Sequence, residues 1–148
     1  MGETQLSDND AKPLFTMKVF PEGRSLYFRV NVWPTKKAMH RHVTWCEPPF
    51  EALCSPYTKL DYRNGRGRTS PECGQINFYR KRIGSAVISH EFAHAALAWA
   101  RRVKLSPENL LGDANDGAKA HPDEERFCHA LDRMIGTFID RGYKANLF

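Results

Sequence analysis

The chain has 148 residues, of which 41% are hydrophobic and 26% are charged, and its formal net charge is +5 at pH 7. This length and composition predict one globular domain over residues 1–148, and the 11% of aromatic residues exclude a wholly disordered chain. No run of about 18 apolar residues occurs, which excludes a membrane-spanning helix. Residues 1–13 have the polar composition of a flexible leader and lack the pattern of a signal peptide, so we expect a cytoplasmic protein.

The cysteines indicate no disulfide framework. Cys46, Cys54, Cys73 and Cys128 are irregularly spaced, and none of them forms a CxxC pair. Zinc knuckles need close cysteine pairs, and disulfides are typical of secreted chains. We therefore expect free, buried thiols.

The first half of the chain predicts strands. Residues 14–20 and 25–33 alternate apolar and polar side chains on either side of a proline–glycine turn, which predicts a β-hairpin. Residues 36–45 fit a strand or a short helix. Residues 46–71 are rich in turn-forming and basic side chains, and residues 74–79 predict one further short strand.

The second half predicts helices. Residues 85–102 have helical spacing with two arginines at the end, and residues 106–109 fit one short turn. A loop of small residues over 112–120 precedes Pro122, where a proline followed by three acidic residues predicts a helix to about residue 141. The expected fold is α+β, with a small, mostly antiparallel sheet followed by two main helices.

The most informative motif is His90-Glu91-x-x-His94 inside the first of these helices. Residues four apart share a helix face, so both imidazoles can bind one Zn²⁺ at about 2.0–2.1 Å. Glu91 lies about 100° around the helix from His90, where its carboxylate can act as a general base on a water activated by the metal.

Such a zinc site needs a third protein ligand. Glu124 falls on the apolar stripe of the last helix, where a buried carboxylate needs a cation, whereas Glu125 falls beside the stripe. Compensation of the helix dipole explains the same acidic cluster without any metal. The other candidates are Glu125, His121, His129, His40 and His42.

The motif with a glutamate on a following helix resembles the zincin metallopeptidases of the gluzincin type. The layout over residues 74–140 is similar to the compact ImmA/IrrE-type and SprT-like intracellular metallopeptidases. The resemblance implies that His90, His94 and Glu124 bind Zn²⁺ and that Glu91 is the catalytic base. It also implies that residues 75–79 form an edge strand that pairs with a protein or peptide substrate, with Gln75, Asn77 and Tyr79 as binding residues.

Two other functions fit the sequence. The chain could be a catalytically weak zinc-fold protein that binds or regulates a macromolecular partner. It could also be a protease guided to nucleic acid by the basic region 63–82, although a solvated basic loop explains that region as well. The cations concerned are Arg63, Arg66, Arg68, Arg80, Lys81 and Arg82. We favour the zinc-dependent peptide hydrolase, with no membrane partner.

Overall fold

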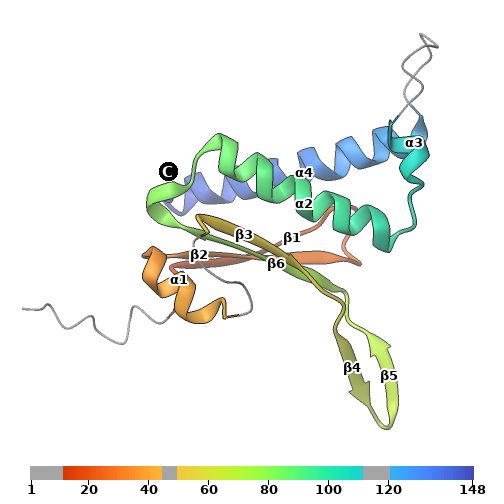
Figure 1. Cartoon of the computed structure of the whole chain (residues 1–148), viewed down its shortest axis with the longest axis horizontal. Helices are drawn as coiled ribbons and strands as arrows, with labels where there is room; N and C mark the ends of the chain where they lie inside the picture. Colours follow the sequence, from red (N-terminus) through yellow and green to blue (C-terminus); the bar gives the residue numbers. More distant parts are fainter. Residues whose placement is uncertain (1–11, 45–49, 112–120) are drawn as a thin grey trace, which may run out of the picture.

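The computed structural model describes residues 12–44, 50–111 and 121–148 (Figure 1). Residues 1–11 of the leader predicted over 1–13, Cys46 and the predicted loop over residues 112–120 lie outside the described residues. The α+β class is confirmed, because a sheet and helices form separate layers.

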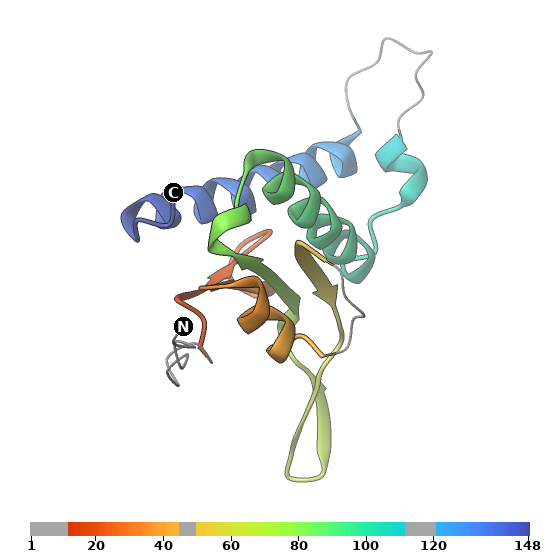
Figure 2. The same ribbon diagram turned by 60° about the vertical axis from the view of Figure 1, so that its left-hand side comes forward.

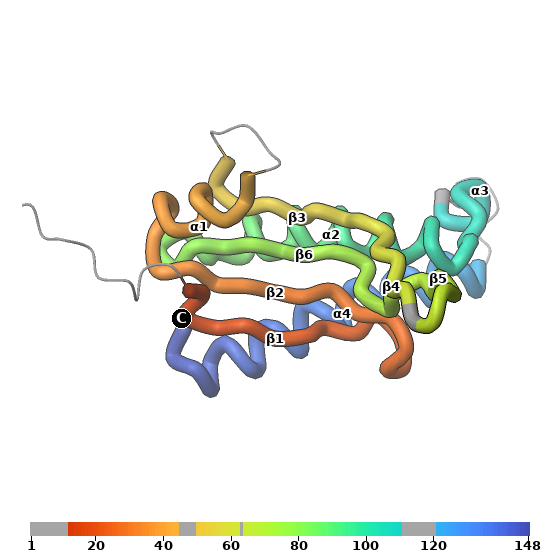
Figure 3. The backbone as a smooth tube through the Cα atoms, turned by 90° about the horizontal axis from the view of Figure 1, so that it is seen from below, coloured from red at the N-terminus to blue at the C-terminus, as the bar shows by residue number. Residues whose placement is uncertain are grey.

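Four strands form the main sheet, in the order β1-β2-β6-β3 (Figure 3). They are β1 (Phe15–Val19), β2 (Tyr27–Trp33), β3 (Ala52–Pro56) and β6 (Glu72–Tyr79). β1 pairs with β2 and β3 pairs with β6 in antiparallel fashion, whereas β2 and β6 are parallel. The sheet is therefore mixed, with the expected antiparallel pairing at both of its sides.

The predicted hairpin is formed by β1 and β2, with Phe15 opposite Val32 and Val19 opposite Phe28. Its apolar side chains alternate with polar ones, and Val19, Phe28 and Val32 are fully buried on the face that carries the long helices. The alternation of the sequence thus sets which face of the sheet joins the core.

Helices cover the two faces of the sheet unequally (Figures 1 and 2). The long helices α2 (Ser85–Arg102) and α4 (Pro122–Lys144) lie on one face, and α1 (Lys36–His42) lies on the other. The short elements η2 (Arg80–Arg82) and α3 (Pro107–Leu111) flank α2 in the sequence. None of the helices in the described part of the chain is long and apolar enough to cross a membrane.

The segment that fitted a strand or a helix is the helix α1. Thr35 begins it, because the Thr35 hydroxyl accepts a 3.1 Å hydrogen bond from the Ala38 amide. Ala38 and Met39 then pack on Trp33 beneath the sheet. This second, smaller core fixes the end of β2 against α1.

The main core lies between the sheet and the two long helices. Phe78 of β6 and Phe138 of α4 stack with ring centroids 5.3 Å apart, and Phe92 of α2 lies 5.6 Å from Phe138. All three rings are at most 1% exposed. Burial of each such side chain stabilises the fold by about 1.5–3 kcal/mol, so this cluster holds α2 on the sheet.

The prediction that residues 75–79 form an edge strand is wrong. β6 pairs with β2 on one side and with β3 on the other, so its backbone is not open to a substrate. The side chain of Asn77 accepts hydrogen bonds from Asn31 and Trp33 on the face opposite α2. Gln75 and Tyr79 alternate with Ile76 and Phe78, which face α2, and therefore share the face of Asn77.

The region between β3 and β6 contains a separate hairpin of β4 (Leu60–Arg63) and β5 (Arg66–Thr69). Its tip, Asn64-Gly65, has φ angles of 52° and 74°, as a tight hairpin turn requires. The hairpin extends away from the main sheet (Figure 1). Regular pairing thus occurs within a segment that the sequence marks only as turn-rich and basic.

Candidate metal centre

His90 and His94 present their imidazole nitrogens to each other on one face of α2. Their Nε2 atoms are 3.2 Å apart, and their ring planes cross at 85°. Two nitrogens bound tetrahedrally to one zinc at about 2.0–2.1 Å would be about 3.3 Å apart. The observed spacing fits a shared ion, and it also fits a single N–H···N bond between the rings. Both side chains are exposed, so an ion could reach them from solvent.

Glu91 lies between α2 and the edge strand β3. Its side chain is 7% exposed, and its Oε2 atom accepts a 2.6 Å hydrogen bond from the Cys54 amide. Successive amides of a strand point to opposite sides, and Tyr57, three residues after Cys54, donates its amide to Cys73 of β6. The Cys54 amide therefore points away from β6. The carboxylate is therefore held in one orientation by the outer edge of the sheet.

A groove of about 290 Å³ brings the predicted motif residues together. One wall comes from β3 and the other from α2, so the groove follows the outer edge of the sheet. Its lining residues are Ala52, Leu53, Cys54, Pro56, His90, Glu91, His94, Leu97, Ala98 and Arg101. Sequence reasoning missed the β3 wall, whose only signal is the short alternation of Ala52 and Cys54 before a proline.

The thiol of Cys54 borders the groove but is unreactive at neutral pH. Burial raises its pKa to about 12, and the negative charge of Glu91 adds to the effect. At neutral pH the thiol is protonated, and a thiol rather than a thiolate is a poor nucleophile and a poor zinc ligand. The prediction of free, buried thiols is confirmed for Cys54 and Cys73, whereas Cys128 is free but exposed.

The structure does not bring the predicted third ligand to the two histidines. Glu124 lies in the first turn of α4, and this turn packs at the far end of α2, where Arg126 lies 5.5 Å from the Trp99 ring. On the same face of the sheet, α2 contacts the edge strand β3, whereas α4 contacts β1 at the opposite edge. Within the described ranges, no group of three His, Cys, Asp or Glu side chains could hold a metal. Glu124 as a ligand stays a prediction.

The alternative ligands have other partners. The His121 ring accepts a 3.1 Å hydrogen bond from the Asp123 amide and so caps α4. His129 lies 3.7 Å from Glu125, one turn away on the same helix. On the opposite face of the sheet, His40 contacts the Phe50 carbonyl and His42 stacks on Trp33, both from α1.

Tyr79, expected to bind substrate, belongs to a cluster around Glu51. The Tyr79 hydroxyl donates to Glu51, which also pairs with Lys36 at 2.6 Å and with Arg82 at 3.2 Å. These hydrogen bonds, led by that of Lys36, lower the Glu51 pKa to about 2. The cluster joins α1 to the end of β6 and to η2, and none of its members lines the groove.

The chain matches no protein-family model, no curated protein and no solved structure at a significant level. The functional proposal therefore depends on the chain's own residues.

Proposed function

We propose that the chain is a zinc-dependent peptide hydrolase of the zincin type. The observation that carries this proposal is the pair of Nε2 atoms 3.2 Å apart, with the buried carboxylate of Glu91 beside it on α2. Two imidazoles and a carboxylate converging on one groove supply two of the three zinc ligands and the base that metal-assisted hydrolysis needs.

The donor chemistry fits zinc. Imidazole nitrogens suit Zn²⁺, and catalytic zinc sites use three protein ligands and leave one position open. His90 and His94 would supply two of these ligands; Glu124, the predicted third, lies at the far end of α2 and is not brought to them by the structure. When bound, Zn²⁺ would lower the pKa of a coordinated water to about 7.

Glu91 would act as the general base. One oxygen of its carboxylate is held by the Cys54 amide. The other oxygen can take a proton from the attacking water and pass it to the leaving amine. Because the first oxygen is fixed, the second keeps a constant position relative to the groove.

β3 rather than β6 would align the substrate. In this edge strand the alternate residues Ala52 and Cys54 direct their carbonyls away from β6, towards the side where the groove opens. An extended peptide can add to such an edge through main-chain hydrogen bonds with little dependence on its sequence. The scissile bond would then lie beside Glu91.

Metal analysis tests the proposal. The purified chain should bind about one zinc per molecule, and His94→Ala should lose it. His42→Ala is the matched control, because His42 stacks on Trp33 on the opposite face of the sheet and should leave the zinc content unchanged. Full zinc retention by His94→Ala would overturn the proposed site.

A further inference from the structure

The hairpin of β4 and β5 extends from the body as a two-stranded ribbon (Figures 1 and 2). Leu60 and Tyr62 are 52% and 70% exposed, and none of the ribbon's described side chains belongs to either hydrophobic core. An isolated two-stranded hairpin is at best marginally stable in water. Packing in a hydrophobic core therefore does not explain why the chain contains this ribbon. Its exposed side chains indicate a role at the surface.

The pairing register divides those side chains between two faces. Asp61 lies opposite Arg68, and alternation places Arg66 on the same face. The other face carries Tyr62 opposite Gly67, where the tyrosine ring covers the glycine. The ribbon thus has one cationic face and one aromatic face. The Arg63 side chain is outside the described ones.

The cationic face borders a cavity of about 620 Å³ at the base of the ribbon. Arg66 and Arg68 line one side, and Arg102 from the end of α2 lines another. Arg102 donates to the backbone carbonyls of Ser70 and Glu72. Throughout residues 12–44, 50–111 and 121–148, no carboxylate pairs with any of these three guanidinium groups. Three cations therefore face one cavity, and Asp61 is the single acidic residue among its described lining residues.

We infer that the β4–β5 ribbon is a binding arm for duplex DNA. The major groove of B-form DNA admits a two-stranded β-ribbon, and arginines on one face can contact the phosphates beside it. The net charge of +5 favours a polyanion. A-form RNA has a major groove too narrow for side chains, so the ribbon shape favours DNA. The inference is independent of the zinc site.

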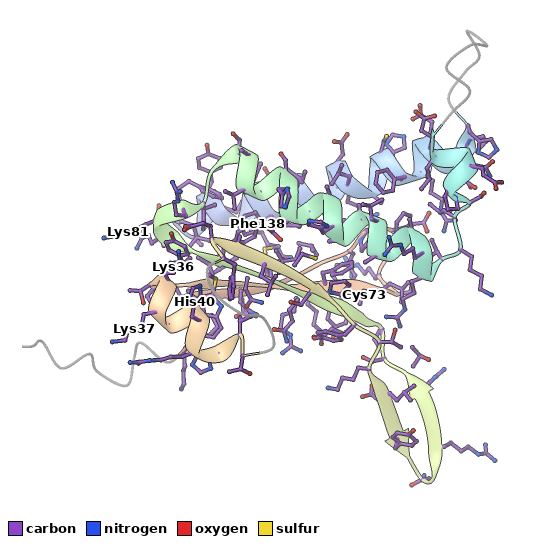
Figure 4. All side chains as sticks on the ribbon, in the orientation of Figure 1. Lys36, Lys37, His40, Cys73, Lys81 and Phe138 are labelled. Carbon is purple, nitrogen blue, oxygen red and sulfur yellow. The ribbon has the colours of Figure 1, made fainter. Side chains whose placement is uncertain are left out.

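The structure separates this arm from the other basic residues of the region. η2 lies at the opposite end of the sheet, as the label of Lys81 shows (Figure 4). There Arg82 pairs with Glu51, and Arg80 donates to the Asn146 carbonyl. The basic region predicted over residues 63–82 therefore divides into two parts. The β4–β5 ribbon carries arginines without a carboxylate partner among the described residues, whereas the charge of η2 is partly neutralised by Glu51.

Fluorescence anisotropy with a labelled duplex of about 20 base pairs tests the inference on the full chain. Arg66→Ala with Arg68→Ala should weaken binding roughly 10–100-fold at about 0.1 M salt, because two phosphate contacts are lost. The slope of log K against log salt should fall by about 1.8. The matched control is Arg80→Ala with Lys81→Ala, which removes the same charge and should change affinity by at most a few-fold.

Three results would overturn the inference. They are absence of binding by the wild-type chain at about 50 mM salt, equal losses in the two double variants, and equal affinity for an RNA duplex, a single strand or heparin. Arg66 and Arg68 are both exposed, so their double variant should keep the wild-type circular dichroism and melting temperature. His94→Ala should bind DNA as the wild type does, which separates failure of the arm from failure of the zinc site.

Discussion

The amide of Cys54 donates a 2.6 Å hydrogen bond to Oε2 of Glu91, and this bond joins the edge strand β3 to the helix α2. An edge amide normally bonds to water or to an added strand. Here the chain's own acidic side chain occupies it. This hydrogen bond thus links the proposed base directly to the strand proposed to pair with the substrate.

Glu91→Gln should separate catalysis from folding. The amide oxygen of glutamine still accepts from Cys54, so the free energy of unfolding should change by less than about 1 kcal/mol. Peptide hydrolysis should fall about 10²–10⁴-fold while zinc is retained, because glutamine cannot accept the proton. Hydrolysis of a labelled peptide mixture and metal analysis measure the two effects.

Two further variants sharpen this test. Glu91→Leu leaves the Cys54 amide without its acceptor and should cost about 1–3 kcal/mol in urea denaturation. Glu125→Gln is the control, because Glu125 is exposed and lies outside the groove. Wild-type hydrolysis by Glu91→Gln would refute the general base and favour the zinc-fold binding protein.

Gly74→Ala should loosen the groove by displacing β3. Gly74 has a φ of +155°, and a Cβ there would stand 2.5 Å from the Ser55 carbonyl oxygen of β3. Strain of this kind costs about 1–3 kcal/mol, which thermal unfolding would detect.

Gly136→Ala is the matched control for that substitution. Gly136 lies within α4, and nothing stands within 4 Å of its added Cβ. Alanine is the better helix former, so this variant should be more stable than the wild type by about 0.5–1 kcal/mol. Equal effects of the two substitutions would contradict the close approach at Gly74.

Glu51 should titrate well below the ordinary value of a glutamate carboxyl group. Its pKa is lowered from 4.5 to about 2, so folding favours the ionised carboxylate. Its contribution to stability is therefore present above the unfolded value and is lost as pH falls through about 2. Carbon-13 NMR of the carboxyl group measures the midpoint. Glu51→Gln should weaken the acid dependence of unfolding, and a midpoint near 4.5 would contradict the cluster with Lys36, Tyr79 and Arg82.

The described cysteines should differ in reactivity. At about pH 8, iodoacetamide should modify the exposed Cys128 readily and leave Cys54 and Cys73 unmodified, because burial raises the pKa of both thiols. Peptide mapping by mass spectrometry identifies the modified residues. Labelling of Cys54 as fast as Cys128 would show that β3 leaves the sheet in solution.

Local patterns predicted the helices well. The bounds of α2 agree with the predicted residues 85–102, because helical periodicity and terminal charges are local signals. α4 continues past the predicted end near residue 141, since Gly142 does not terminate it. A Cβ at Gly142 would stand 2.3 Å from the Phe148 ring, so this glycine permits a close contact with the C-terminal residues.

Nonlocal pairing was not predictable from the sequence. β3 is five residues long and ends at Pro56, within a stretch that reads as turns, and its position outside β6 depends on contacts between distant segments. Periodicity placed Glu124 on a buried stripe but gave no information on which flank of α2 that stripe would meet. The motif residues share one helix, so their proximity followed directly from spacing.

The strand order also has a consequence for biosynthesis. β3 leaves the ribosome before β6, yet β6 is its only neighbour in the described sheet. Until β6 inserts between β2 and β3, nothing can hold the Cys54 amide in place, and α2 follows β6 in the chain. A nascent polypeptide that ends before α2 therefore lacks the groove.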